Sequence, residues 1–163
     1  MTDVEALYRQ HAPAVFRFAL SLSGNRAAAE DITAETFVRV WTARERLDLT
    51  TVVGYLLTIA RRLHLQGVTA DRRRSPLEIE PADERPGAEA ATDQRRALGA
   101  VLADLQTLPE IDRAALLMRA EDAMPYDQIA RALGIGAGAA KVKVHRARQR
   151  LAALRLERET PRR

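Results

Sequence analysis

Apolar residues recur every three or four positions over three stretches of the first 66 residues, the spacing that places them on one face of a helix. The first stretch covers residues 4–22, and Asn25 follows it at a position from which it can cap the next helix. The stripe of this second helix that is predicted to be buried contains Ile32, Thr36, Phe37, Val40 and Trp41. A polar break over 46–51 precedes a third helix that is predicted to end near Gly67. Three helices with short connections predict a bundle.

The helical pattern is interrupted over residues 67–93, which contain three prolines, two glycines and few large apolar side chains. Helical spacing resumes over 98–105 and again over 111–118, on either side of Leu108-Pro109. We therefore expect an all-α protein of two small helical domains joined by a flexible linker. The predicted units are a three-helix bundle at 1–66, the linker at 67–93, a second helical domain at 94–157 and a basic tail at 158–163.

The last two predicted helices have the pattern of a helix-turn-helix. Pro125 can begin the first of them and Gly134 can end it in a turn. Ala130 is small enough for the two helices to cross closely. The second helix presents basic residues over 141–148, which suit DNA phosphates and base edges. A plain helical hairpin would have the same turn, so the basic second helix is the feature that favours DNA binding.

Charge is distributed unevenly along the chain. The formal net charge is +4 overall, but it is +1 over 1–66, −3 over 67–93 and +6 over 94–163. Residues 134–163 hold nine basic side chains against Glu157 and Glu159. Such a density attracts a polyanion such as DNA or RNA, although a solvated helix face with a frayed tail would have the same composition.

Composition excludes several other classes of protein. The chain has no cysteine, which excludes disulfides, thiolate zinc sites, iron–sulfur clusters and cysteine nucleophiles. No apolar run approaches the ~20 residues of a membrane span, and the N-terminus is acidic, so we expect a cytoplasmic protein without membrane insertion. No nucleophile–base set, phosphate loop or metal-ligand cluster is present in the sequence, so we expect neither enzymatic activity nor a cofactor.

Four segments stand in the order and spacing of one known family. They are AEDITAETFVRVW at 29–41, GYLLTIARR at 54–62, YDQIARALG at 126–134 and KVKVHRAR at 141–148. The chain resembles the extracytoplasmic-function sigma factors of the sigma-70 family, which carry a promoter-melting region 2, a linker and a helix-turn-helix region 4. The resemblance covers nearly the whole chain.

The resemblance implies a dissociable subunit of RNA polymerase. Region 2 would open the minus-ten element, and region 4 would dock on the minus-thirty-five element and on the flap of the second-largest subunit. An anti-sigma factor is a further implied partner. The alternative is a sigma-like adaptor or a helix-turn-helix regulator that does not initiate transcription itself; binding to core polymerase would separate the two.

Carboxylates on the second predicted helix are the candidate contacts to polymerase. From the residues alone, this acidic face is either solvated or grips a basic partner helix. The resemblance implies that it binds the clamp helices of the largest polymerase subunit. The contacts that it assigns there are Asp31, Glu35 and Arg39.

The resemblance also assigns DNA-binding residues in both regions. The loop at 46–51 would capture a flipped base of the minus-ten element, because loop amides and hydroxyls suit an unpaired base edge. The candidates in this loop are Asp48, Thr50 and Thr51. The candidates for holding the strand backbone are Arg61, Arg62, His64 and Arg72 to Arg74. The minus-thirty-five candidates are Ala139, Lys141, Val142, Lys143, His145, Arg146 and Arg148.

The chain departs from the family pattern at a few of these positions. Arg62 and Gln66 stand where the family usually has Asn and Asp. In the recognition helix, Ala139 and Lys143 belong to a segment that lacks the usual Thr and Ser hydroxyls, which predicts altered reading of the minus-thirty-five element. Pro125 replaces the usual capping Ser, a cap that contributes ~1 kcal/mol.

Overall fold

The computed structural model describes residues 4–42, 52–73 and 89–160. Its helices are α1 (Val4–Ser23), α2 (Arg26–Thr42), α3 (Val52–Arg73), α4 (Glu89–Gln106), α5 (Glu110–Asp122), α6 (Tyr126–Leu133) and α7 (Ala137–Glu159). The described part of the chain contains no β-strand, which confirms the predicted all-α class. Within it, none of the helices is both long enough and apolar enough to cross a membrane.

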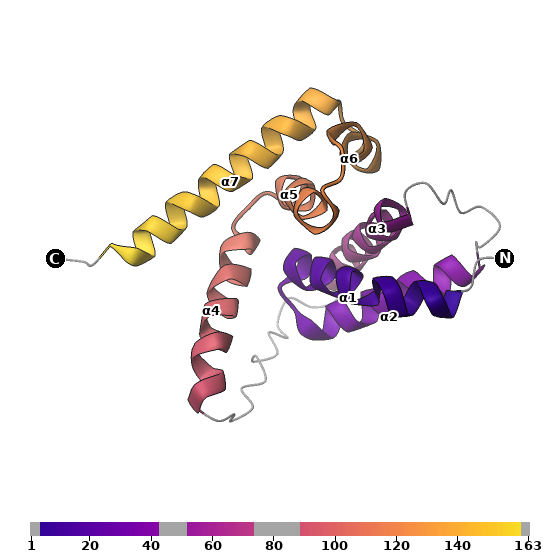
Figure 1. The fold of residues 1–163 in the computed structure, drawn as a ribbon, viewed down its shortest axis with the longest axis horizontal. Helices are drawn as coiled ribbons and strands as arrows, with labels where there is room; N and C mark the ends of the chain where they lie inside the picture. Colours follow the sequence, from indigo (N-terminus) through magenta and orange to yellow (C-terminus); the bar gives the residue numbers. More distant parts are fainter. Residues whose placement is uncertain (1–3, 43–51, 74–88, 161–163) are drawn as a thin grey trace.

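Helices α1, α2 and α3 pack against one another as the predicted bundle (Figure 1). The largest side chains that they bury completely are Val15, Phe18, Leu22, Val40, Leu56 and Leu57. Each contributes about 1.5–3 kcal/mol by leaving water. The predicted cap is present, because Asn25 Oδ1 accepts a hydrogen bond from the Ala28 N–H at 3.0 Å.

Helix α3 continues to Arg73, beyond the end predicted near Gly67. A glycine weakens a helix by roughly 1 kcal/mol, but it ends one only where the chain turns into the left-handed region. Gly24 and Gly134 have φ values of 67° and 70°, whereas Gly67 keeps a helical φ. Because helix bounds alone do not divide a chain into domains, the limits expected at 66, 93 and 157 stay predictions.

Helices α6 and α7 form the predicted helix-turn-helix. Gly134 caps α6 in the left-handed conformation, and the N–H of Ile135 donates to Ala130 O at 3.0 Å. The buried side of α6 packs on the buried side of α7. The buried apolar residues of the two helices are Ile129, Ala130, Leu133, Ala140, Val144 and Ala147. Pro125 is the N-cap of α6 rather than its first residue and supplies no side-chain hydrogen bond.

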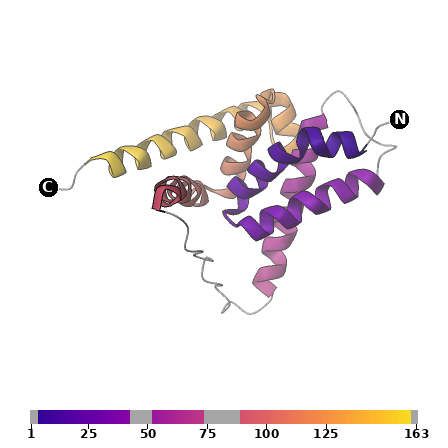
Figure 2. The same ribbon diagram turned by 60° about the horizontal axis from the view of Figure 1, so that its bottom comes forward.

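Helix α5 lies between the α1–α3 bundle and α7 (Figures 1 and 2). The buried guanidinium of Arg113 on α5 donates to Leu22 O of α1 at 2.6 Å and to Leu105 O and Leu108 O at 2.8 and 3.0 Å. Burial lowers the pKa of Arg113, and the Glu110 carboxylate partly offsets that change. The buried residues of both halves form one core, so the two expected domains are in direct contact in this structure.

Trp41 is not in the core, which corrects the prediction from its spacing. Its side chain is 56% exposed, whereas Phe37 is only 5% exposed. The buried positions of α2 are Ala29, Ile32, Thr33, Thr36, Phe37 and Val40. Trp41 lies next to this stripe at the last turn of α2. Leu151 and Leu154 on α7 are half-buried.

Candidate nucleic-acid and partner interfaces

One exposed face of α2 carries all three predicted polymerase contacts. Asp31, Glu35 and Arg39 are four residues apart and exposed, so they lie along the same side of the helix. Arg39 Nε is 3.4 Å from Glu35 Oε1, with both side chains about half exposed. An ion pair this exposed contributes about 0.3–0.5 kcal/mol at most, so both groups stay accessible to a partner.

Two apolar side chains extend this acidic face, and the sequence interpretation missed both of them. Val38 is 53% exposed and Trp41 is 56% exposed. Val38 is three residues after Glu35 and seven after Asp31, so it lies on the same side of the helix as these carboxylates, and Trp41, three residues after Val38, lies at the flank of that side. We call these four residues the α2 face. The spacing of Val38 from Asp31 and Glu35 was the signal in the sequence that could have identified this face.

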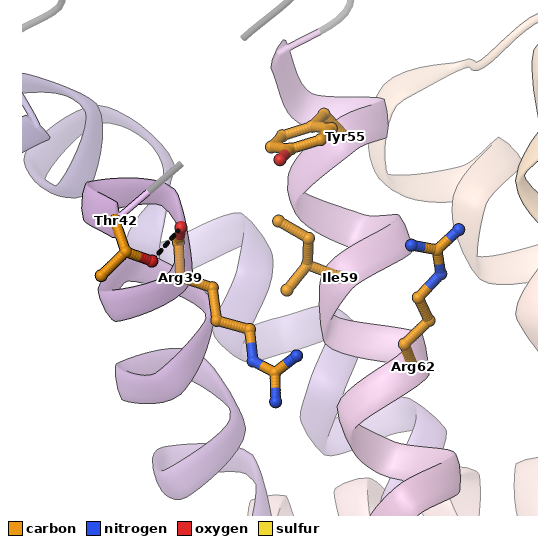
Figure 3. A pocket seen from close by; sticks show the side chains of 5 residues that line it. All are labelled: Arg39, Thr42, Tyr55, Ile59 and Arg62. Atoms are coloured by element: carbon orange, nitrogen blue, oxygen red, sulfur yellow. Dashed lines mark hydrogen bonds between the residues drawn. The ribbon is translucent and has the colours of Figure 1, made fainter. Parts of the chain in front are cut away.

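A cavity of about 430 Å³ opens between α2 and α3. Its lining residues are Arg39, Thr42, Tyr55, Ile59 and Arg62. Figure 3 shows Arg39 extending from α2 toward α3, and Tyr55 and Ile59 extending from α3 toward α2. Thr42 Oγ1 donates to Arg39 O at 3.0 Å. Two guanidinium groups, one aromatic ring and an apolar floor match the chemistry of a nucleotide, which offers a phosphate and a flat base.

The cavity adjoins the chain segment that was predicted to capture a base. Thr42 and Val52 are the last and first described residues on either side of 43–51. Asp48, Thr50 and Thr51 lie in that segment, outside the described residues, and Arg74 also lies outside them. Arg62 is exposed and lines the cavity, whereas Tyr55 was not among the predicted residues.

Arg61 and His64 lie on another side of α3, facing α5. The Nε and Nη2 atoms of Arg61 donate to the two carboxylate oxygens of Glu110 at 2.9 and 2.8 Å. His64 is buried, and desolvation lowers its pKa; Glu110 opposes this change, while Arg113 and Arg61 add to it. The structure thus brings Arg62 to the cavity and places Arg61 and His64 at the contact between the two helical groups.

The recognition helix α7 presents most of its predicted residues to solvent. Its exposed candidates are Ala139, Lys141, Val142, His145, Arg146 and Arg148. Lys143 is different, because its Nζ lies 3.6 Å from Asp112 Oδ1 on α5 and its side chain is 22% exposed. Gly136 caps the helix without a side-chain hydrogen bond, which leaves backbone N–H groups at its positive end available to an anion.

Metal chemistry finds no support in the part of the chain that the structure describes. No group of three or more His, Cys, Asp or Glu side chains in this part could hold a metal ion.

Two family descriptions match the chain, one over its first half and one over its second half. The Sigma-70 region 2 family matches residues 7–74, which contain the α2 face and the cavity. The Sigma-70, region 4 family matches residues 98–151, which contain α5, α6 and the exposed part of the recognition helix.

Curated relatives match across both regions. The extracytoplasmic-function (ECF) RNA polymerase sigma factor SigE of Mycolicibacterium smegmatis is 38% identical over 93% of this chain, and the chain spans 61% of its length. SigL of Mycobacterium tuberculosis is 31% identical, over 87% of this chain and 82% of the relative. EcfG of Rhodopseudomonas palustris is 30% identical, over 87% of this chain and 79% of the relative.

Two solved structures share the fold. The sigma factor RpoE in complex with the anti-sigma factor NepR from Bartonella quintana has a TM-score of 0.76 and 23% identity, over 98% of this chain and all of that one. CnrH in complex with the cytosolic domain of CnrY has a TM-score of 0.69 and 23% identity, over 96% of this chain and 89% of that one. Together, the region matches and the relatives of 30% identity or more show that the chain belongs to the ECF sigma factors, the subunits that direct RNA polymerase to promoters.

Proposed function

We propose that this chain binds core RNA polymerase through the α2 face and positions it on a promoter through the cavity and the recognition helix. The observation that carries this proposal is the α2 face, where Asp31 and Glu35 are followed by exposed Val38 and Trp41. Its action is binding rather than catalysis, and its place of action is the cytoplasm, where it meets polymerase.

The polymerase contact combines an electrostatic contribution and an apolar contribution to binding. Asp31 and Glu35 attract a basic partner helix and orient it, which raises the association rate and the specificity. Trp41 supplies the apolar area, because a desolvated tryptophan at the centre of an interface commonly dominates the binding energy. Val38 packs beside it and helps to exclude water.

The cavity takes up part of the minus-ten strand. Arg39, predicted from the sequence as a polymerase contact, lines this cavity with Arg62, and we assign both to phosphates; the Tyr55 ring stacks on a base that has left the duplex. Asp48, Thr50 and Thr51 read the edge of that base from the neighbouring segment. Opening the duplex costs a few kcal/mol, which binding of the exposed strand offsets.

Region 4 then binds the minus-thirty-five element through α7. Lys141, Arg146 and Arg148 contact phosphates, and Val142 contacts a thymine methyl group. Because Ala139 offers no hydroxyl, we expect fewer polar base contacts here and a larger share of phosphate binding. An anti-sigma factor is a further expected partner, supported by the structural relative RpoE, which was solved in complex with the anti-sigma factor NepR.

Charge reversal on α2 tests the polymerase contact. The double variant Asp31→Lys/Glu35→Lys is expected to lose at least about tenfold in affinity for purified core polymerase, measured by fluorescence anisotropy of the labelled chain. The matched control Glu157→Lys changes an exposed carboxylate on α7 and is expected to bind as the wild type does. If the wild-type chain does not bind core polymerase, the proposal is wrong and a plain helix-turn-helix regulator takes its place.

A further inference from the structure

The outward side of α7 carries an exposed glutamine, Gln149, that was not among the residues predicted from the sequence. The inward side of α7 is defined by its buried residues Ala140, Val144 and Ala147. Because successive residues of a helix are about 100° apart, Gln149 lies almost directly opposite the middle of that buried side. Figures 1 and 2 both show α7 along an edge of the molecule, so this outward side is free to meet a ligand.

Gln149 completes a row of exposed residues on this side of α7. The row consists of Val142, His145, Arg146 and Gln149, and we call it the α7 row. Its members stand at positions i, i+3, i+4 and i+7, which are neighbours on a helix surface. The base-contacting residues of the homeodomain recognition helix have this same spacing in the major groove of DNA. The spacing therefore places Gln149 where a recognition helix can still reach a base edge.

The chemistry of this side of α7 changes directly after Gln149. The same spacing continued from Gln149 reaches Ala152, Ala153 and Leu156, which are exposed but have no polar side-chain atom. Gln149 is therefore the last residue of this series whose side chain can form a hydrogen bond with a base. Its amide has a donor and an acceptor side by side, whereas Val142, at the other end of the α7 row, offers only apolar contact.

We propose that Gln149 is a specificity-determining residue that reads one adenine of the minus-thirty-five element: its amide oxygen accepts from the N6 amino group, and its amide nitrogen donates to N7. A neutral side chain adds nothing to the attraction of phosphates, so its effect is discrimination between bases. Gln149 lies roughly 10 Å along α7 from Val142, which corresponds to about two or three base pairs. The inference rests on the proposed function for the placement of α7 in the major groove.

Selection from a DNA library by the complete holoenzyme tests this assignment. The probe is duplex promoter DNA randomised over the minus-thirty-five element, captured by core polymerase that carries the wild-type chain or Gln149→Met, which keeps the side-chain length without the amide. The wild type is expected to prefer adenine at one position by at least about fivefold, the lower end for a bidentate pair, and Gln149→Met to lose that preference alone. The matched control Gln94→Met, at an exposed position of α4, should select as the wild type does. Unchanged preferences in Gln149→Met overturn the proposal.

Two further changes test the hydrogen bonds themselves. Gln149→Arg is expected to shift the preference at the same position from adenine to guanine, because a guanidinium donates to guanine O6 and N7. Replacing the selected adenine by 7-deazaadenine removes the N7 acceptor and keeps the base pair. This replacement should weaken binding of the wild-type holoenzyme by about fivefold, the effect of one hydrogen bond, and leave Gln149→Met unaffected. An equal loss in both holoenzymes would show that another group contacts N7 and would overturn the proposal.

The wild-type selection separates this inference from the function on which it rests. If the wild-type holoenzyme selects a minus-thirty-five element while Gln149→Met keeps every base preference, the role of Gln149 is wrong and the proposed function stands. If the wild-type holoenzyme selects no such element, the placement of α7 in the major groove is wrong, and the role of Gln149 is wrong with it.

Discussion

Phe37 and Trp41 are four residues apart on α2, yet one is buried and the other is exposed. The Phe37 ring packs edge-on against Tyr8 of α1, with ring centroids 5.0 Å apart at an angle of 73°. Trp41 keeps more than half of its surface in water, at the end of the α2 face. A partner that covers the exposed part of this indole would bury apolar area, which is why we assign Trp41 to the polymerase contact.

Alanine substitutions at these two residues are expected to have opposite effects. Trp41→Ala should weaken binding to core polymerase by about tenfold or more and change the free energy of unfolding by less than about 0.5 kcal/mol. Phe37→Ala should lower the free energy of unfolding by about 3–5 kcal/mol. Urea denaturation and a core-binding titration check both. A Trp41→Ala chain that binds polymerase as tightly as the wild type would contradict the assignment.

At the scale of single elements, the cap between α1 and α2 contributes to the stability of the bundle. Asn25→Ala removes the acceptor of the Ala28 N–H and should lower the free energy of unfolding by about 1 kcal/mol. Gln149→Ala, at an exposed position of α7, is the control and should leave it within about 0.5 kcal/mol. Urea denaturation of both variants measures the difference, and equal midpoints would show that the cap contributes nothing.

The two lysines of the recognition helix are expected to differ in their effect on the salt dependence of DNA binding. Lys141 is exposed, whereas Lys143 is paired with Asp112. Lys141→Ala should therefore reduce the slope of log K against log salt by about 1 for duplex DNA, the value for one phosphate contact. Lys143→Ala should reduce it less. Titrations of duplex at several salt concentrations measure both slopes, and a larger change for Lys143→Ala would argue against the pairing in solution.

At the scale of the whole molecule, the contact between the two helical groups should depend on pH. His64 faces Arg61 on its own helix and Glu110 and Arg113 on α5, and burial lowers its pKa below the ordinary 6.5. The unfolded chain therefore takes up a proton at a higher pH than the folded chain does. The contribution of neutral His64 to the free energy of unfolding is therefore fully present above pH 6.5. It falls as the pH drops through 6.5 and stops changing below the lowered pKa.

Chemical denaturation between pH 5 and pH 8, about the range in which histidine titrates, measures this dependence. The slope should not exceed about 1.4 kcal/mol per pH unit, the value for one proton. His64→Gln should remove this component and flatten the profile in that range. A profile that is the same in the variant would show that another group carries the dependence.

The helical class and the helix-turn-helix could be predicted because local patterns decide them. Apolar spacing marks which face of a helix is buried, and Gly134 marks a turn that only the left-handed conformation makes. Gly67 was misjudged as an end because a glycine without a positive φ can remain within a helix. Whether Phe37 or Trp41, four residues apart on α2, is buried depends on which of them other helices cover, which the local pattern does not show.

Neighbours in the sequence proved to be weak guides to neighbours in space. Arg61 and Arg62 were predicted to act together, but adjacent helix residues point about 100° apart. One faces Glu110 across the interface, and the other lines the cavity with Arg39. The contact between α3 and α5 joins residues about 50 apart in the chain, and no local pattern could have indicated it.

The most direct test of the account is promoter-specific initiation. Purified core polymerase is incubated with a library of promoters, with and without the chain, and the starts of the run-off transcripts are located by sequencing. We expect discrete start sites that share two spaced upstream elements and that are lost when the chain is omitted. The absence of such chain-dependent starts, even with tight binding to core polymerase, would contradict the sigma function proposed here.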